Sequence, residues 1–258
     1  MKNGKSLKEN LRNKVPLMGT FVKTPSPIIV EVLANSGLDF LILDAEHSPF
    51  GREALDLCIM TARLKGCPVL VRVPEMSPSA ILNALDLGAT GVVVPHLTSA
   101  QQAEEMVKIC HYGAGGRGYA GSTRAADYGT VPISTHLANS AAQTVIIGQI
   151  EDPAGVEAID EIAAVPGLDC LFIGRVDLTI GYEATSPQDP VVEAAVKRVC
   201  EAAGAANRAL GMFLPNMTEV PRFLDSNVSL FAMASEHQMI REGFQSYLKS
   251  EEWTEAQL

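Results

Sequence analysis

Short apolar segments alternate with amphipathic segments along almost the entire chain, and this alternation is the strongest constraint on its fold. Continuous apolar runs are typical of parallel strands that are buried on both faces, with helices between them. Eight such units in 258 residues favour a closed (β/α)8 barrel over an open sheet. The expected strands are Leu17–Phe21, Phe40–Leu43, Pro68–Val71, Gly91–Val94, Thr144–Ile150, Cys170–Ile173, Leu210–Leu214 and Leu230–Ala234.

The amphipathic segments are expected to be helices, several of which end at a glycine. Glycine readily adopts the left-handed conformation that often ends a helix, and Gly66 and Gly88 occupy such positions. No segment rich in Pro, Gly and Ser divides the chain, so residues 1–258 are expected to form one domain. Within it, residues 1–15 would be a solvated arm or short helix, and residues 236–258 a C-terminal helix. The expected helices are approximately Pro27–Ser36, Arg52–Lys65, Pro78–Leu87, Ser99–Cys110, Ile133–Ala142, Gly155–Val165, Asp189–Asn207 and Glu236–Lys249.

The overall charge and composition exclude several classes of partner. A net charge of −10 would repel nucleic acid and anionic membranes, and an aromatic content of 5% offers few surfaces for base stacking. No apolar run reaches the roughly 18 residues of a membrane span, and the lysine-rich start lacks the apolar region of a signal peptide. The five cysteines include no CxxC pair and are expected to be reduced core residues. We therefore expect a cytoplasmic protein that acts on a small molecule.

Polar and charged residues follow directly after most of the expected strands. In a barrel of parallel strands these positions meet at one opening. Carboxylates can hold a divalent metal ion, an arginine can bind an anionic substrate, and a histidine can transfer protons. The pattern therefore predicts a metal-dependent site for an anionic substrate. The residues are Asp44, Glu46, His47, Arg72, His96, Glu151 and Asp177.

The densest part of this group is the segment Asp44–Pro49, for which a purely structural role is the alternative. Asp44 could cap the following helix, and His47 could hydrogen-bond a loop. One motif without structural context does not decide between these hypotheses. The polar residues at the other strand ends favour the functional one.

The regular alternation breaks between Tyr112 and about Pro132, where Gly, Arg, Ser and Tyr are frequent. A loop of this length inside a compact domain is typical of a lid or binding loop. Residues Gly113–Gly118 match the pattern GxGxxG, but they follow a helix instead of a strand, so a dinucleotide site is not expected. Arg117 and Arg124 could contact an anionic substrate or brace the loop, and bracing is the favoured interpretation.

Six segments of the chain carry a family resemblance: Asp44–Pro49, Val71-Arg72, Gly115–Gly118, Gln149–Glu151, Phe172–Gly174 and Asp177-Leu178. In this order and spacing they resemble the signature segments of the HpcH/HpaI family of class II pyruvate aldolases. The resemblance extends from about Met18 to Glu236. It implies a (β/α)8 barrel and a divalent metal ion, Mg²⁺, Mn²⁺ or Co²⁺, bound by Glu151 and Asp177. It also implies reversible cleavage of 4-hydroxy-2-oxo acids into pyruvate and an aldehyde.

The resemblance also implies roles for individual residues in such a reaction. Arg72 would face the oxygen that becomes an enolate, where a positive charge favours the transition state. His47, oriented by Asp44, would take the proton from the C4 hydroxyl while the C3–C4 bond breaks. These roles are hypotheses that the arrangement of the side chains must support.

Four further residues are expected to contact the substrate. Gln149 would hold a metal-bound water or a substrate oxygen, and Gly174 and Val176 would offer backbone N–H groups to the pyruvate carboxylate. Arg175 departs from the family pattern, which more often shows Pro or another uncharged residue there. It could recognise a second carboxylate or form a salt bridge with a neighbouring carboxylate, and the sequence favours neither.

Other functions are open to the same scaffold. An oxaloacetate decarboxylase or a CoA-ester lyase would need the same metal ion, although a CoA substrate would favour a basic groove that this acidic chain does not suggest. A non-catalytic barrel that binds a 2-oxo acid is the alternative from a different class. A Schiff-base aldolase would need a lysine at the end of an inner strand. Lys23 is the candidate for it, and it lies beyond the end of the first strand.

The last expected helix carries an apolar stripe of Ile240, Phe244, Tyr247 and Leu248. This stripe could pack on its own barrel, whereas the resemblance implies that the closing helix is exchanged between subunits. We expect a homo-oligomer, and the resemblance implies a hexamer arranged as a trimer of dimers.

Overall fold

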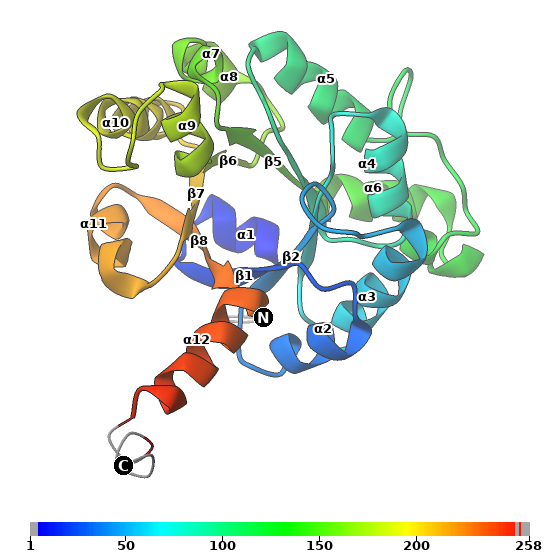
Figure 1. Cartoon of the computed structure of the whole chain (residues 1–258). Helices are drawn as coiled ribbons and strands as arrows, with labels where there is room; N and C mark the ends of the chain where they lie inside the picture. Colours follow the sequence, from blue (N-terminus) through cyan, green and yellow to red (C-terminus); the bar gives the residue numbers. More distant parts are fainter. Residues whose placement is uncertain (1–4, 251–252, 254–258) are drawn as a thin grey trace.

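Eight parallel strands close into a barrel in chain order, with β8 paired to β1 (Figure 1). The computed structural model describes residues 5–250 and 253. All eight expected segments form strands, and every strand end lies within two residues of its predicted position. The strands are β1 (Leu17–Val22), β2 (Phe40–Asp44), β3 (Val69–Arg72), β4 (Gly91–Val94), β5 (Val145–Ile150), β6 (Cys170–Ile173), β7 (Ala209–Leu214) and β8 (Val228–Ser235).

The core has two layers because alternate residues of each strand point to opposite faces of the sheet. In β2, Phe40 and Ile42 pack inside the barrel, whereas Leu41 and Leu43 pack in the layer between the strands and the helices. All four side chains are completely buried. Burial on both faces explains why the strands are continuous apolar runs.

The helices surround the barrel and largely match the predicted ones (Figure 1). The expected helix Gly155–Val165 is two shorter helices, because the backbone leaves helical geometry at Ala158. Two short helices, α9 and α11, were not predicted. The helices are α1 (Leu7–Arg12), α2 (Pro27–Ala34), α3 (Arg52–Leu64), α4 (Pro78–Asp86), α5 (Ala100–Cys110), α6 (Ile133–Gln143), α7 (Pro153–Glu157), α8 (Ile159–Ala164), α9 (Arg175–Gly181), α10 (Pro190–Ala205), α11 (Val220–Asp225) and α12 (Glu236–Leu248).

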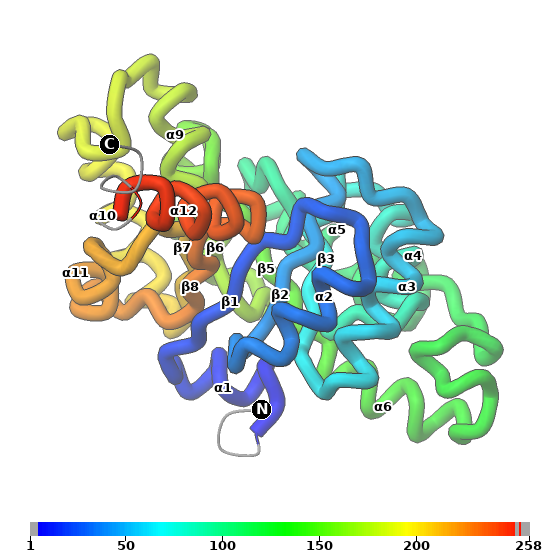
Figure 2. Tube along the Cα trace, turned by 60° about the horizontal axis from the view of Figure 1, so that its bottom comes forward, coloured from blue at the N-terminus to red at the C-terminus, as the bar shows by residue number. Residues whose placement is uncertain are grey.

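The N-terminal segment is a short buried helix, not a solvated arm. Leu7 and Leu11, one turn apart in α1, are buried in the same apolar cluster as the interior of the barrel. Figure 2 shows α1 at one end of the strands. The Lys8 ammonium group is also buried, donates to the Thr144 carbonyl oxygen at 2.6 Å and lies 3.0 Å from the Asp169 carboxylate. This helix therefore contributes to the barrel core.

Helix α12 leaves the barrel at β8 and projects away from it (Figure 1). The helix ends at Leu248, one residue before the expected Lys249, and residues 251–252 and 254–258 of the expected C-terminal segment lie outside the described part of the chain. Its apolar stripe, Ile240, Phe244, Tyr247 and Leu248, is exposed. None of the helices within the described residues is long and apolar enough to cross a membrane.

The five cysteines are free thiols, and four of them are buried. Burial raises the pKa of Cys58 and of Cys67 to about 11, so neither is a reactive thiolate at neutral pH. The prediction of reduced core cysteines agrees with these positions.

Candidate active site

The polar residues that follow the strands come together at the carboxyl end of the barrel. Asp44 and Arg72 are direct neighbours in the register of β2 and β3. A cavity of about 290 Å³ opens beside them, and residues from six strand ends line it. The lining residues are Phe21, Lys23, His47, Arg72, Gln149, Phe172, Gly174, Arg175, Val176, Asp177 and Phe213.

Asp44 is the buried centre of the charged residues at this end. Its Oδ1 atom accepts from Nε of Arg72 at 2.9 Å and from the backbone N–H of His47 at 3.2 Å. Its Oδ2 atom lies 2.9 Å from Nζ of Lys23. Burial raises the pKa of Asp44, but the hydrogen bonds from Arg72 and Lys23 outweigh it and lower the pKa to about 2. The carboxylate is therefore ionised throughout the neutral range.

The imidazole of His47 lines the cavity, but Asp44 does not orient it. Asp44 contacts the backbone of His47, and the ring atom Nε2 lies 3.7 Å from Oε2 of Glu46. The expectation that Asp44 orients the His47 ring is therefore wrong for this structure. The reason is that Arg72 and Lys23 occupy the Asp44 carboxylate.

Glu46, His96 and Glu151 form the group that best fits a cation among the described residues. Their ligand atoms all lie within 4.8 Å of one another. The backbone N–H of His96 donates to Oε1 of Glu151 at 2.8 Å, and its ring Nδ1 lies 2.9 Å from Asp152. His96 adopts a left-handed backbone conformation with φ of 54°, which is unfavourable for a residue with a side chain.

Two features of this group and of the neighbouring Gln149 fit a bound cation. Burial, followed by the charges of Asp177 and Glu46, raises the pKa of Glu151 against the opposing effect of His96. Oε2 of Glu46 and Oε1 of Gln149 are buried without a hydrogen-bond partner, although Nη1 of Arg72 lies 3.2 Å from that Glu46 oxygen. A divalent cation would satisfy oxygens of this kind, so the residues fit the expected metal ion.

The neighbouring carboxylates also raise the pKa of His96. The hydrogen bond that the His96 ring donates to Asp152 raises the pKa of His96, burial opposes the increase, and the charges of Glu151, Asp152 and Glu46 add to it. The ring is thus already engaged by the carboxylate of Asp152, which is not one of the residues that line the cavity.

The expected ligand Asp177 lines the cavity next to this group without joining it. Its side chain is exposed in the first turn of α9, and its charge contributes to the raised pKa of Glu151. Gln149 donates to Oε2 of Glu151. Glu151 and Asp177 are therefore near enough to influence one another electrostatically, with Gln149 beside them.

The segment that precedes Asp177 passes very close to Glu151. A Cβ atom on Gly174 would lie only 2.6 Å from Cβ of Glu151, so a glycine is required here. The N–H of Gly174 donates to the Ile150 carbonyl at 2.9 Å and is therefore not available to a substrate. Val176 lies in the first turn of α9, where N–H groups lack partners within the helix.

The guanidinium of Arg175 points away from the carboxylate ligands and forms ion pairs. Nη1 lies 2.9 Å from Glu219, Nη2 lies 3.7 Å from Glu193, and the group stacks over Phe223 at 5.0 Å. The side chain is 6% exposed. This geometry is the salt-bridge alternative that the sequence left open.

Arg117 and Arg124 also form internal contacts instead of lining the cavity. Arg117 pairs with Asp86, and Arg124 pairs with Asp56 and donates to the Leu87 carbonyl at 3.0 Å. Both therefore brace the long loop, as the favoured interpretation expected.

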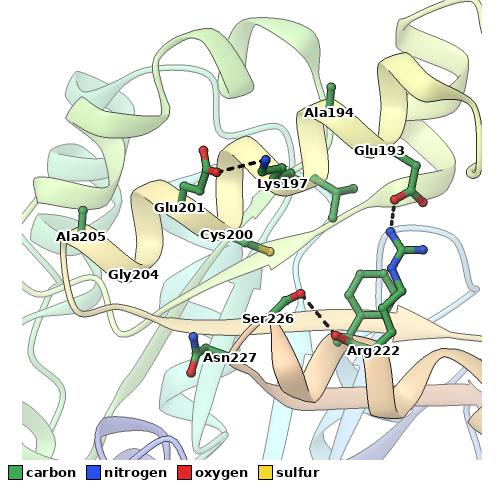
Figure 3. A pocket seen from close by; sticks show the side chains of 12 residues that line it. Glu193, Ala194, Lys197, Cys200, Glu201, Gly204, Ala205, Arg222, Ser226 and Asn227 are labelled. Atoms are coloured by element: carbon green, nitrogen blue, oxygen red, sulfur yellow. Dashed lines mark hydrogen bonds and ion pairs between the residues drawn. The ribbon is translucent and has the colours of Figure 1, made fainter.

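A larger cavity, of about 670 Å³, lies between α10 and α11 (Figure 3). Its charged residues neutralise one another: Glu193 pairs with Arg222, and Lys197 lies 3.7 Å from Glu201. No strand-end residue lines it. Size alone therefore does not identify the site, and the smaller cavity at the strand ends carries the chemistry.

The sequence did not single out the apolar wall of the smaller cavity or the role of Lys23. Phe21, Phe172 and Phe213 form this wall, with Phe21 and Phe172 packed edge to face at 6.1 Å. The Arg72 guanidinium lies over the Phe21 ring, with its central carbon Cζ 4.7 Å from the ring centre. Lys23 directly follows β1, so its position could have marked it as a site residue in the same way as the other residues that follow strands.

Comparisons with known proteins identify the family of this chain. A family model described as HpcH/HpaI aldolase/citrate lyase matches residues 17–242. A hydroxypyruvate/pyruvate aldolase of Paraburkholderia phytofirmans is 35% identical over 240 residues, which cover 89% of this chain and 91% of that protein. A 5-keto-4-deoxy-D-glucarate aldolase of Shigella boydii is 31% identical over 241 residues, which cover 92% of this chain and 93% of that protein.

The fold comparison gives the same result. The crystal structure of an HpcH/HpaI aldolase/citrate lyase family protein from Burkholderia cenocepacia superimposes with a TM-score of 0.89 at 29% identity, covering 94% of this chain and 97% of that chain. With the family model spanning most of the barrel, this chain belongs to the HpcH/HpaI aldolase/citrate lyase family.

Proposed function

We propose that this protein is a divalent-metal-dependent aldolase that reversibly cleaves 4-hydroxy-2-oxo acids into pyruvate and an aldehyde. The observation that carries the proposal is the joint presence of His47, Arg72, Gln149 and Asp177 around one small cavity beside Glu151. Membership of an aldolase family, with relatives named as aldolases, supports it. The cavity volume suits a small acid.

Glu151 and Asp177 would hold the metal ion, with Glu46 beside them. Mg²⁺ and Mn²⁺ prefer oxygen ligands, and the ring of His96 is already engaged by Asp152. When bound, such an ion supplies a Lewis acid that polarises the keto group of a 2-oxo acid. Gln149, adjacent to Glu151, would orient a water molecule or a substrate oxygen, and the N–H of Val176 would bind the carboxylate of the pyruvate half.

Arg72 supplies a fixed positive charge at the cavity. Asp44 and Glu46 hold its guanidinium, so its position does not depend on the substrate. A preorganised cation stabilises negative charge that develops on the former keto oxygen more than it stabilises the neutral ketone. Arg72 therefore favours formation of the pyruvate enolate.

His47 is the proton acceptor in the cleavage direction. Its imidazole lines the cavity, is exposed and lies 3.7 Å from the Glu46 carboxylate, so it is accessible to a substrate hydroxyl. It would accept the C4 hydroxyl proton while the C3–C4 bond breaks; the bonding electron pair stays on C3, and the C4 carbonyl leaves as the aldehyde. Protonation at C3 then completes pyruvate.

The test is pyruvate release from a panel of 4-hydroxy-2-oxo acids and oxaloacetate, with EDTA and after addition of Mn²⁺ or Mg²⁺. Metal-dependent release from the hydroxy-oxo acids is expected. Release from oxaloacetate alone would assign a decarboxylase instead. Metal binding without turnover of any 2-oxo acid or CoA ester would indicate a non-catalytic binding barrel.

We further propose that the protein assembles as a homo-oligomer, a hexamer arranged as a trimer of dimers, through α12. Ile240, Phe244 and Tyr247 are between 49% and 73% exposed on a helix that projects from the barrel. An apolar stripe of this kind favours burial against another surface. Packing of α12 on a neighbouring barrel supplies that surface.

A further inference from the structure

We infer that Glu236, the first residue of α12, is a positioning residue for the proposed reaction. Its carboxylate fixes the backbone at Lys23, and the Lys23 side chain holds the Asp44 carboxylate. Asp44 in turn holds Arg72 at the cavity. The inference rests on the proposed aldolase function, in which Arg72 favours the enolate. It assigns a role in that reaction to a residue that does not line the cavity.

Glu236 is a buried carboxylate that binds the backbone of the segment after β1. Its side chain is 3% exposed. The two carboxylate oxygens lie 2.8 Å and 3.0 Å from the backbone nitrogen of Lys23, and Oε1 also accepts from the N–H of Thr24 at 2.5 Å. No lysine or arginine forms an ion pair with it in the described part of the chain, although Nε2 of His237 lies 3.5 Å from Oε1. Because burial of a carboxylate is costly, these hydrogen bonds must hold both Glu236 and the segment that it contacts.

Helix capping does not explain why Glu236 is buried. Ser235 is the N-cap of α12, and its side chain accepts from the N–H of Gln238. An acidic side chain in the first turn interacts favourably with the helix dipole even when it is exposed. The sheet explains its position instead, since Ser235 in β8 is the register partner of Phe21 in β1. The start of α12 therefore lies beside the end of β1 (Figure 1).

The Lys23 side chain connects this anchor to the charged residues of the cavity. Nζ donates to Oδ2 of Asp44 at 2.9 Å, and Oδ1 accepts from Arg72 and from the backbone N–H of His47. Lys23 is thus held by Glu236 at its backbone and by Asp44 at its ammonium group. If Nζ moved away, Oδ2 would be free to accept a second hydrogen bond from Arg72, because a guanidinium readily binds both oxygens of a carboxylate. That contact would change the orientation of Arg72 at the cavity.

The balance of charge at this side of the cavity gives a second reason. Arg72 pairs with two carboxylates, Asp44 and Glu46, and Lys23 supplies the second positive charge, so the four charges balance. Displacement of the Lys23 ammonium group leaves an excess of negative charge around Arg72. Negative charge that develops on the enolate oxygen is then stabilised less. A misplaced Lys23 should therefore slow enolate formation more than it weakens substrate binding.

The experiment measures two rates with the full chain loaded with Mg²⁺. One is the exchange of the C3 hydrogens of pyruvate with deuterium, and the other is pyruvate release from a 4-hydroxy-2-oxo acid. Glu236→Gln should reduce the exchange rate and kcat by about 10- to 100-fold and change KM by less than about threefold. Lys23→Met should give a loss of similar size, and Lys23→Arg should retain most of the activity. Glu242→Gln, which removes a charge from the exposed part of the same helix, should leave both rates unchanged.

A double variant separates positioning from general destabilisation. If Glu236 acts through Lys23, Glu236→Gln should reduce kcat of the Lys23→Met protein by less than about twofold. Reduction by the same factor in both backgrounds is expected of a merely structural residue and would overturn the inference. Amide hydrogen exchange is the readout that does not depend on turnover. Glu236→Gln should accelerate it in the segment that contains Lys23 and Thr24, and unchanged exchange there would also overturn the inference.

The same measurements distinguish failure of this inference from failure of the proposed function. A normal kcat in Glu236→Gln, with an active wild-type protein, would overturn the positioning role and leave the aldolase intact. Absence of both deuterium exchange and pyruvate release in the wild-type protein would overturn both proposals. Should Glu236→Gln fail to fold, Glu236→Asp keeps the charge, shortens the reach to the Lys23 N–H and takes its place in each comparison.

Discussion

Oδ1 of Asp44 lies 2.9 Å from both Nε and Nη2 of Arg72, which makes a completely buried carboxylate the anchor of the cationic side of the cavity. The two residues are register partners on adjacent strands. Removing one of them leaves the other charge buried without compensation, which is costly. This pair therefore links the stability of the barrel to the position of Arg72.

Asp44→Asn should destabilise the protein in a pH-dependent way. The pKa of Asp44 is lowered in the folded state from 3.8 to about 2, so its ionised form stabilises the fold above about pH 4, and this contribution disappears as the pH falls to about 2. A shift of this size corresponds to roughly 2 kcal/mol at neutral pH. Urea unfolding of both proteins between pH 7 and the lowest pH at which both fold should show the difference shrinking. A difference independent of pH would contradict this.

His47→Gln should lower kcat by about 100- to 10,000-fold while leaving metal affinity within about twofold, because His47 is assigned to proton transfer and not to the metal ion. Single-turnover assays of pyruvate release and calorimetric titration with Mn²⁺ measure the two quantities. Full activity of the variant would remove His47 from the mechanism, and loss of Mn²⁺ binding would place it among the ligands.

Glu151→Gln and Asp177→Asn should each raise the Kd for Mn²⁺ by at least about tenfold, because both carboxylates are assigned as ligands. His96→Gln is the matched comparison, since its ring already contacts Asp152, and it should change the Kd less. Titration of EDTA-treated protein gives these values without an activity assay. If His96→Gln weakens binding and Asp177→Asn does not, the ion is held by the Glu46, His96 and Glu151 group instead.

Arg175→Met should cost more stability than Arg222→Met. Both guanidinium groups lie 5.0 Å from the Phe223 ring and pair with Glu193 and Glu219, but the Arg175 side chain is 6% exposed and that of Arg222 is 50% exposed. Loss of the buried partner is expected to cost about 2 kcal/mol or more, and loss of the exposed one about 1 kcal/mol or less. Urea unfolding measures both, and equal losses would show that burial of Arg175 has no energetic consequence.

Replacing Phe244 and Tyr247 together by Asp should reduce the oligomer to smaller species at micromolar concentration, because charge on the exposed stripe of α12 opposes its burial. Gln245→Asp on the same helix is the charge control and should keep the mass of the wild-type protein. Sedimentation velocity measures the masses. A monomeric wild-type protein would refute the assembly itself.

The barrel fold, its strands and the grouping of the polar residues that follow them could be predicted from the sequence alone. Strands that are buried on both faces must be continuous apolar runs, so segments such as Phe40–Leu43 and Cys170–Ile173 can be recognised as strands in the sequence. Parallel strands also bring every residue that follows them to the same end of the barrel. Asp44, Arg72 and Glu151 could therefore be grouped without knowing any distance.

Only the tertiary structure determined which groups these side chains contact. Whether Asp44 binds the His47 ring or Lys23, and whether the Arg175 guanidinium is left for a substrate or pairs with Glu219, depends on distances between residues far apart in the chain. Long charged side chains reach any of several neighbours from one backbone position, so strand-end spacing does not determine their direction. The α1 helix shows the same limit. Leu7 and Leu11 are too few to identify a core segment in the sequence, and they are buried only because the barrel interior lies next to α1 in the folded structure.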